Sequence, residues 1–221
     1  MATPANTFFG SDQIQRSVWV VVDPKDSVTG ARVTDPLRVS IKDVPANPIA
    51  ARSGVYCFTD LNLPVAEYTV QVEPLTRTRY LNEETKFTLQ LIPLPGQALR
   101  RNPVPVELMP RPDYPFDAQS TLARGRLVKT SDSSPISGAN IFLTVDTADK
   151  GRRGKTDERG EFAVLFPTVA IAVNDPPSAK PRDFTFQLKF KLLDNREHLT
   201  AAKTVTEGTT ISMNEIKFPG T

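Results

Sequence analysis

The sequence contains one set of strand-like segments twice, and this internal repeat constrains the fold more than any other feature. Each copy has an apolar first segment, a Gly-Ala turn, a segment that begins close to a glycine, and a further alternating segment. They lie at residues 17–22, 29–33, 53–58 and 68–72 in the first copy, and at residues 122–128, 137–141, 159–164 and 184–188 in the second. Order, spacing and residue type agree, so two domains of one kind are predicted.

Large apolar residues alternate with small or polar ones inside these segments. Phe184, Phe186 and Leu188, for example, alternate with Thr185 and Gln187. A period of two is typical of a strand that packs one face against a second sheet. The chain also has 20 Pro in 221 residues, nearly twice the usual frequency of about 5%, which disfavours long helices. The expected fold class is all-β, with two β-sandwiches.

A Pro-rich stretch separates the two copies. Within it Val104, Val106 and Leu108 alternate properly and predict a closing strand for the first copy. Pro103 and Pro105 have no N–H to donate, so we expect this strand at a sheet edge. The predicted divisions are an N-terminal arm over 1–14, a first sandwich over 15–109, a stiff Pro-rich connector over 110–118 and a second sandwich over 119–221.

Residues 137–141 read Ser-Gly-Ala-Asn-Ile and residues 156–162 read Thr-Asp-Glu-Arg-Gly-Glu-Phe. With these motifs the chain resembles the carboxypeptidase regulatory-like domains, which are small transthyretin-like Greek-key β-sandwiches. The first copy is similar at residues 29–33, 53–56 and 66–70 but lacks the Thr-Asp pair. The resemblance implies two tandem Greek-key sandwiches of the transthyretin/Ig-like kind. It implies spacer, adhesive or assembly roles and no peptidase activity, because the zinc ligands of such enzymes lie in a separate domain.

The sequence contains few residues that could support catalysis or bind a metal ion. One His and one Cys exclude a two-His zinc site, a four-ligand Cys/His site and a disulfide within the chain. His198 lies near carboxylates at residues 194–197, but there is no Gly-x-Ser-x-Gly elbow to supply a nucleophile. Cys57 lies in an alternating segment, where we expect a small structural side chain rather than a nucleophile. We therefore predict no enzyme and no cofactor.

Charge gives no strong attraction to nucleic acid or membranes, since the net charge is +2. The densest basic run, residues 150–155, is expected in a hairpin loop as a solvated tip or a contact for an acidic protein. Acidic residues flank it and weaken the case for nucleic acid. Calcium is not expected, because the candidate carboxylates do not form an Asp-x-Asp-x-Asp-Gly loop. These carboxylates are Asp23, Asp26, Asp146 and Asp149.

The first ten residues lack the basic start and apolar run of a secretory signal. The longest apolar stretch, residues 162–173, is interrupted by Pro167 and is shorter than the roughly 20 residues of a membrane span. We expect cytoplasmic synthesis without a signal peptide and no membrane partner. Incorporation into a particle that leaves the cell stays open.

These observations favour a non-enzymatic structural or adaptor subunit of a larger protein assembly. A phage-tail-like or contractile injection particle is one such assembly. The alternative is a carbohydrate- or peptide-binding β-sandwich module, which would need exposed aromatic platforms or a free edge strand. Tyr80 and Tyr114 lie outside the repeated strands and are candidates for such contacts, while the direction of Trp19 is not determined.

The C-terminal segment is the expected site of subunit contacts. It alternates at Ile211 and Met213 and then, after a slip of one residue, at Ile216 and Phe218. The slip predicts a bulge near Asn214, and the absence of Pro before residue 219 leaves the strand able to pair. The predicted partner-binding residues are Phe8 and Phe9 of the arm together with Ile211, Met213, Ile216 and Phe218.

Overall fold

The computed structural model describes residues 18–59, 61, 63–75, 79–89, 102–167 and 181–220. The predicted N-terminal arm, with Phe8 and Phe9, lies outside the described residues. The described residues form fifteen strands and no helix. Accordingly, this part of the chain has no helix that is long and apolar enough to cross a membrane.

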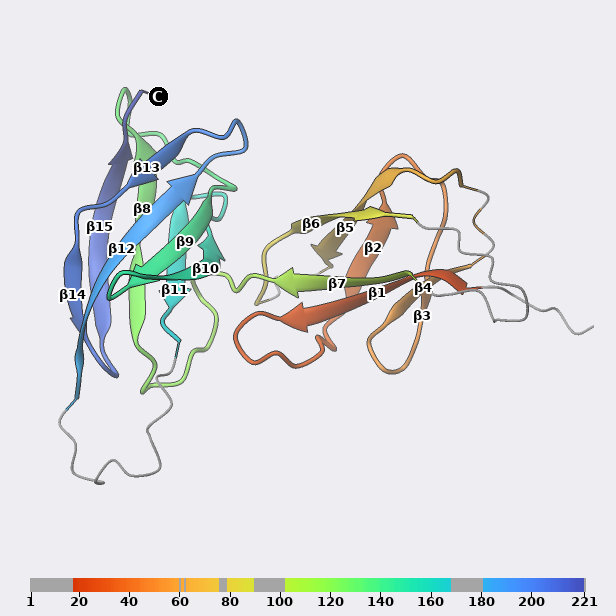
Figure 1. Ribbon diagram of the computed structural model, residues 1–221, viewed down its shortest axis with the longest axis horizontal. Helices are drawn as coiled ribbons and strands as arrows, with labels where there is room; N and C mark the ends of the chain where they lie inside the picture. Colours follow the sequence, from red (N-terminus) through yellow and green to blue (C-terminus); the bar gives the residue numbers. More distant parts are fainter. Residues whose placement is uncertain are drawn as a thin grey trace, which may run out of the picture.

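The strands fall into two sets along the chain (Figure 1). The first set is β1 (Val18–Asp26), β2 (Leu37–Ile41), β3 (Ile49–Ala50), β4 (Tyr56–Thr59), β5 (Glu67–Pro74), β6 (Glu83–Thr88) and β7 (Asn102–Leu108). The second set is β8 (Leu122–Lys129), β9 (Asn140–Val145), β10 (Ala148–Lys155), β11 (Glu161–Leu165), β12 (Asp183–Lys191), β13 (Glu197–Leu199), β14 (Lys203–Thr206) and β15 (Thr210–Phe218).

Each set makes two sheets that face each other. The first sandwich consists of β3-β4-β1-β7 and β2-β5-β6, and the second of β11-β8-β15 and β10-β9-β12-β13, with β14 also paired to β12. Each sandwich has its own hydrophobic core. Val22 and Val106 meet Val39 and Val70 in the first, while Leu127, Phe162 and Met213 meet Leu143 and Phe186 in the second. The all-β, two-sandwich fold class is confirmed.

The two sandwiches share one strand order. In each, the first strand is central, pairs antiparallel with the hairpin strand (β4 or β11) and pairs parallel with the last strand (β7 or β15). The opposite sheets correspond as well, with β2-β5-β6 matching β9-β12-β13. The prediction of one topology for both halves is therefore confirmed at the level of strand order.

The repeat differs at one strand. In the first sandwich the two-residue β3 pairs with β4, whereas in the second the eight-residue β10 pairs with β9 in the other sheet. Asp146 and Thr147 both have positive φ, of 48° and 71°, which matches the tight turn of a two-residue hairpin. The chain therefore returns as a strand directly after β9. The prediction that residues 150–155 form a hairpin loop is wrong, because they belong to β10.

Two local predictions are confirmed. The strand β7, which contains Pro103 and Pro105, is at the edge of its sheet beyond β1. The register between β15 and β8 shifts between Ser212 and Glu215, and Asn214 lies there with a φ of 52°. The bulge lets both ends of β15 direct apolar side chains into one core.

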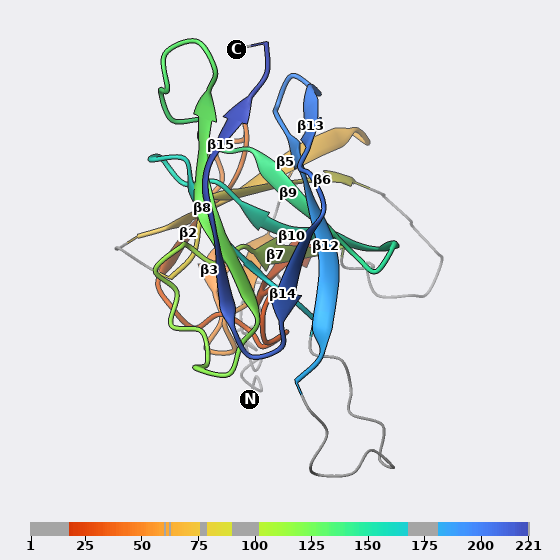
Figure 2. The same ribbon diagram turned by 90° about the vertical axis from the view of Figure 1, so that its left-hand side faces the viewer.

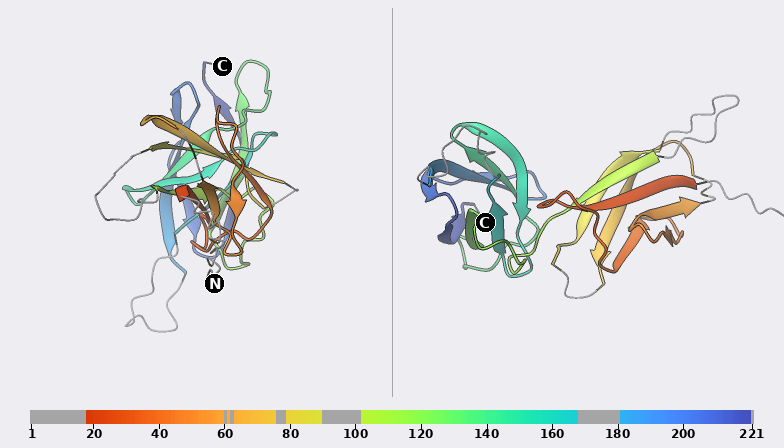
Figure 3. Two further views of the ribbon diagram at one scale, coloured as in Figure 1. Left: turned by 90° about the vertical axis from the view of Figure 1, so that its right-hand side faces the viewer. Right: turned by 90° about the horizontal axis from the view of Figure 1, so that it is seen from below.

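The two sandwiches lie end to end, with a narrow waist between them (Figures 1 and 3). Strands β1 and β7 point toward the second sandwich, whose strands run across that direction. Figure 2 looks onto the second sandwich from its outer side, where β8, β15, β14 and β12 lie nearest the viewer. The waist is made by the chain after β7 and by the loop between β1 and β2.

Gly160→Ala should destabilise the second sandwich far more than Gly138→Ala. Both glycines have positive φ, of 73° and 74°, so alanine costs each about 1–2 kcal/mol. At Gly160, however, a Cβ would also overlap the backbone oxygen of Leu127, whereas nothing lies near Gly138. Urea unfolding followed by circular dichroism should show a loss of at least about 3 kcal/mol for Gly160→Ala. Equal losses for both variants would contradict this packing.

Candidate functional site: the junction between the sandwiches

The chain that leaves β7 stays attached to the first sandwich. Pro110 forms an isolated antiparallel bridge with Tyr80. The backbone N–H of Arg111 donates to the oxygen of Arg79 at 2.8 Å, and that of Leu81 donates to Met109 at 2.9 Å. The start of the predicted connector is thus hydrogen-bonded to the segment before β6, and its stiffness stays a prediction.

A buried carboxylate fastens the next part of the connector. Asp26, at the end of β1, is 4% exposed. Its Oδ1 accepts the N–H groups of Val28 at 2.7 Å and Thr29 at 3.3 Å, while its Oδ2 accepts the hydroxyls of Tyr80 at 2.9 Å and Tyr114 at 2.6 Å. These bonds join the end of β1, the segment before β6 and the connector at one point.

Both tyrosines donate their hydroxyls to this carboxylate, and we call Asp26, Tyr80 and Tyr114 together the Asp26 clamp. Burial, together with the hydrogen bond to Asp26, raises the pKa of Tyr114 to about 12 and that of Tyr80 still further. Both phenols are therefore neutral donors at any physiological pH. The prediction that Tyr80 and Tyr114 contact an external ligand is not supported, since both side chains are buried against Asp26.

The second sandwich contacts the first through its basic strand. Glu83, the first residue of β6, is 3% exposed. Its Oε2 accepts from Nη1 of Arg152 at 3.1 Å, and Nζ of Lys155 lies 3.8 Å from its Oε1. Lys155 also donates to the backbone oxygen of Asn82 at 2.6 Å. The acidic group expected to meet the basic run is thus in the same chain.

Arg111 of the connector makes a second polar contact with the second sandwich. It donates to both carboxylate oxygens of Glu158, at 3.1 Å each. This pairing raises the pKa of Arg111 and lowers that of Glu158. Nη2 of Arg111 also lies 3.8 Å from Oδ2 of the buried Asp157. The bidentate geometry restricts the orientation of the guanidinium group.

The Thr-Asp motif that carried the family resemblance shapes the turn before β11. Oγ1 of Thr156 accepts the N–H of Ala139, and Oδ1 of Asp157 accepts the N–H groups of Arg159 and Glu161. Its role is therefore structural: it closes the turn that presents Glu158 to Arg111.

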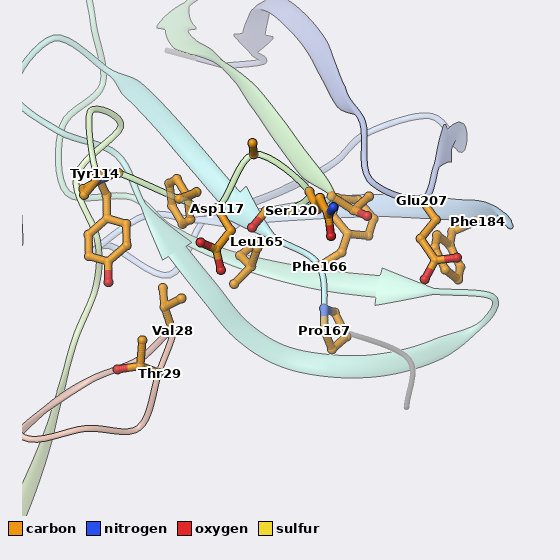
Figure 4. Close-up of a pocket in the computed structure, with 15 residues that line it drawn as sticks. Val28, Thr29, Tyr114, Asp117, Ser120, Leu165, Phe166, Pro167, Phe184 and Glu207 are labelled. Carbon is orange, nitrogen blue, oxygen red and sulfur yellow. The ribbon is translucent and has the colours of Figure 1, made fainter. Parts of the chain in front are cut away.

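A cavity of about 730 Å³ lies between the sandwiches beside the connector (Figure 4). Val28 and Thr29 of the first sandwich face Leu165 and Phe166 of the second across it. The carboxylates of Asp117 and Glu207 lie along its rim. Of the aromatic lining residues, Tyr114, Phe166 and Phe184 are buried and Phe116 is half-buried, so none of them is a fully exposed ring.

The residues considered for chemistry lie apart. His198 is in β13 opposite Phe190, and its ring centre is 5.8 Å from that of Phe218. Cys57 is a half-buried free thiol in β4. The described residues contain no group of three or more His, Cys, Asp or Glu that could hold a metal ion.

The calcium candidates are used by the fold. Asp23 pairs with Arg32 at 2.8 Å, Asp146 accepts the N–H of Thr185 and Asp149 accepts the N–H of Gly151. Asp26 is the hydrogen-bond acceptor of the Asp26 clamp. Each of these carboxylates therefore stabilises a turn, a strand end or an ion pair.

The predicted partner-binding side chains of β15 face inward. Met213, Ile216 and Phe218 are buried in the second core, and Ile211 packs against it half-buried. Phe8 and Phe9 lie outside the described residues. Since β15 is an edge strand of its sheet, any partner would meet its backbone or its outward polar side chains. Partner binding at this strand stays a prediction.

Glu83 and Arg111 were not identified from the sequence. Their partners at the junction lie 69 and 47 residues away, so a local motif could not indicate them. The one available signal is the basic run at residues 150–155. It predicts a solvated tip or a contact with an acidic protein, and not a contact with Glu83 of the same chain.

The comparisons with known proteins do not assign a family. No family model matches the chain, and no curated protein matches it. The resemblance to carboxypeptidase regulatory-like domains is therefore unconfirmed at the family level, and what the structure supports is the tandem all-β fold.

Three solved structures illustrate the similarity. The TIE protein of Bacillus anthracis is 13% identical, with a TM-score of 0.29 over 91% of this chain and 34% of that one. The major pilin subunit of Bacillus cereus is 10% identical, with a TM-score of 0.31 over 92% of this chain and 99% of that one. The shaft pilin SpaA of Lactobacillus rhamnosus GG is 11% identical, with a TM-score of 0.28 over 90% and 97%.

This chain spans about a third of the length of the TIE protein (34%). TM-scores between 0.28 and 0.31 are too low to support an argument about function. The role of the pilins is therefore a property of those proteins alone.

Tyr114→Phe should destabilise the first sandwich by about 2 kcal/mol, because it removes a buried hydrogen bond to a carboxylate. Tyr68→Phe is a matched control, since its hydroxyl donates to Pro64 at an exposed site; we expect less than about 0.5 kcal/mol. Unfolding in urea followed by circular dichroism measures both losses. Equal effects would show that the Asp26 clamp contributes nothing.

Proposed function

We propose that this chain is a non-catalytic spacer that holds two β-sandwiches in a fixed relative orientation within a larger protein assembly. The observation that carries the proposal is the junction, where a buried carboxylate of each sandwich is contacted by cations from across the boundary. Glu83 meets Arg152 and Lys155, and Asp157 faces Arg111.

Domains joined by a flexible linker normally move relative to each other. Here the connector has little freedom, since Tyr114 is fixed to Asp26 and Arg111 to Glu158. The guanidinium of Arg124 also lies 5.5 Å from the ring centre of Phe116 and donates to the oxygen of Pro112. Contacts from both sandwiches therefore act on one short segment, which favours a single interdomain angle.

A spacer needs attachment points at its ends. The edge of β7 is unsuited to strand addition because Pro103 and Pro105 lack N–H donors. We propose the outer edge of β15 and the N-terminal arm as the contacts for other protein subunits. No cofactor, nucleic acid or membrane is part of this proposal, and synthesis in the cytoplasm is compatible with it. Assignment to a contractile injection particle has no support in the structure or in the comparisons.

The cavity beside the connector favours the carbohydrate- or peptide-binding alternative. Its volume of about 730 Å³ is within the usual range of ligand sites. A peptide and glycan array probed with the labelled chain tests this alternative. Binding that Thr29→Trp abolishes would favour it over the spacer, because the larger side chain would fill the cavity.

The spacer proposal predicts that Arg111→Ala combined with Arg152→Ala loosens the pair without unfolding either sandwich. Small-angle X-ray scattering should show a larger maximum dimension and a broader conformational ensemble than for the unaltered chain. The matched control is Arg38→Ala with Lys86→Ala, which removes the same charge from two exposed ion pairs inside the first sandwich. Unchanged scattering from the junction variant would contradict the proposal.

Deletion of residues 1–10 should abolish complex formation in a pull-down from the native source, since the arm is proposed to contact other subunits. Arg153 donates to the oxygen of Lys150 within β10, and Arg153→Ala should weaken binding at most in a salt-sensitive way. Truncation before β15 is no clean test, because it removes core residues. Normal capture by the deleted chain would refute the role of the arm.

A further inference from the structure

Glu83 is an incompletely satisfied buried acid at the boundary of the two sandwiches. Its Oε2 accepts one hydrogen bond from Arg152, while its Oε1 is buried and has no hydrogen-bond partner among the described residues. The nearest cation to Oε1 is the ammonium of Lys155, at 3.8 Å, which is instead bonded to the oxygen of Asn82. An ionised carboxylate in such a site loses hydration that its neighbours only partly replace.

The two cations do not depend on the charge of Glu83. Nη1 of Arg152 also donates to Oδ1 of Asn140 at 3.1 Å, and 30% of its side chain is exposed. Lys155 keeps its bond to the oxygen of Asn82. A proton on Glu83 would therefore leave neither cation without a polar contact, while the carboxyl could still accept from Arg152.

We propose, building on the spacer function, that Glu83 is a proton-operated latch that tightens the junction between the sandwiches on acidification. The charged groups around it are Arg152 and Lys155 from β10 and Glu84 from its own strand. The latch acts in addition to the Asp26 clamp, which does not involve Glu83.

The direction of the effect follows from linkage between docking and protonation. Burial raises the pKa of the Glu83 carboxyl above its ordinary value of 4.5, Glu84 adds to this, and Arg152 and Lys155 oppose it only in part. When the sandwiches separate, water reaches the group and its pKa falls. The docked state therefore binds the proton more tightly, so docking is strongest below the ordinary pKa and weakens as the pH rises through the raised one. Each unit of difference between the two pKa values changes the docking equilibrium about tenfold.

Distances between spin labels on the two sandwiches test the latch. The labels are attached at Arg38→Cys and Lys217→Cys, both exposed, in the full chain with Cys57→Ser. Double electron–electron resonance should give a distance distribution about twofold broader at about pH 8 than at about pH 4.5. Glu83→Gln, which is neutral at both pH values and keeps the shape of the side chain, should give the narrow distribution at both.

Glu67→Gln is the matched control, because this carboxylate of the same sandwich is exposed and pairs with Lys86; it should keep the pH response of the unaltered chain. A width independent of pH, or one that narrows as the pH rises, would overturn the latch and leave the spacer proposal intact. A pH response that persists in Glu83→Gln would also overturn it. A distribution as broad as that of the Arg111→Ala, Arg152→Ala variant at every pH would instead overturn the spacer function. If Glu83→Gln does not fold, the pH series of the unaltered chain decides.

Discussion

The carboxylate of Asp26 determines how the first sandwich ends and where the chain goes next. Buried carboxylates are costly unless hydrogen-bonded, and this one accepts four bonds from three separate segments. Because one of them comes from Tyr114, the connector cannot leave the first sandwich freely. The waist seen in Figure 3 is therefore a packed element rather than a tether.

Polar contacts join the second sandwich to this waist. They include Glu83 with Arg152, Lys155 with the oxygen of Asn82, and Arg111 with Glu158. Exposed ion pairs contribute little on their own, but Glu83 is buried and Arg111 is held from both sides. An interface of this kind specifies one orientation and at the same time makes its strength sensitive to protons and salt.

The strand that differs between the two copies of the repeat is the one that carries the contact residues of the second sandwich. In the second copy the chain forms β10 beside β9, whereas the first copy has only the short β3 beside β4. The longer strand carries Arg152 and Lys155 to the boundary. The strand that has no equivalent in the first sandwich thus supplies the cations that meet Glu83 at the start of β6.

Short-range patterns in the sequence were enough to predict the all-β class, the shared strand order, the Pro-containing edge strand β7 and the bulge at Asn214. Each depends on alternation, turn residues or proline geometry within a few residues. The same alternation marked Ile211, Met213, Ile216 and Phe218 without revealing that their apolar face is the core. The alternation of a single strand is the same whether its apolar face packs in the core or contacts a partner.

The junction depended on tertiary structure. Asp26 and Tyr114 are 88 residues apart, and Glu83 and Arg152 are 69 apart; no periodicity joins such positions. The basic run was visible in the sequence, but its conformation depended on the hairpin at Asp146 and Thr147, and its partner on the packing of the two sandwiches. Sequence alone determined the two folding units, because strand formation and core burial are read from local pattern. Their mutual orientation was decided only in three dimensions, where the burial of a charge depends on what lies against it.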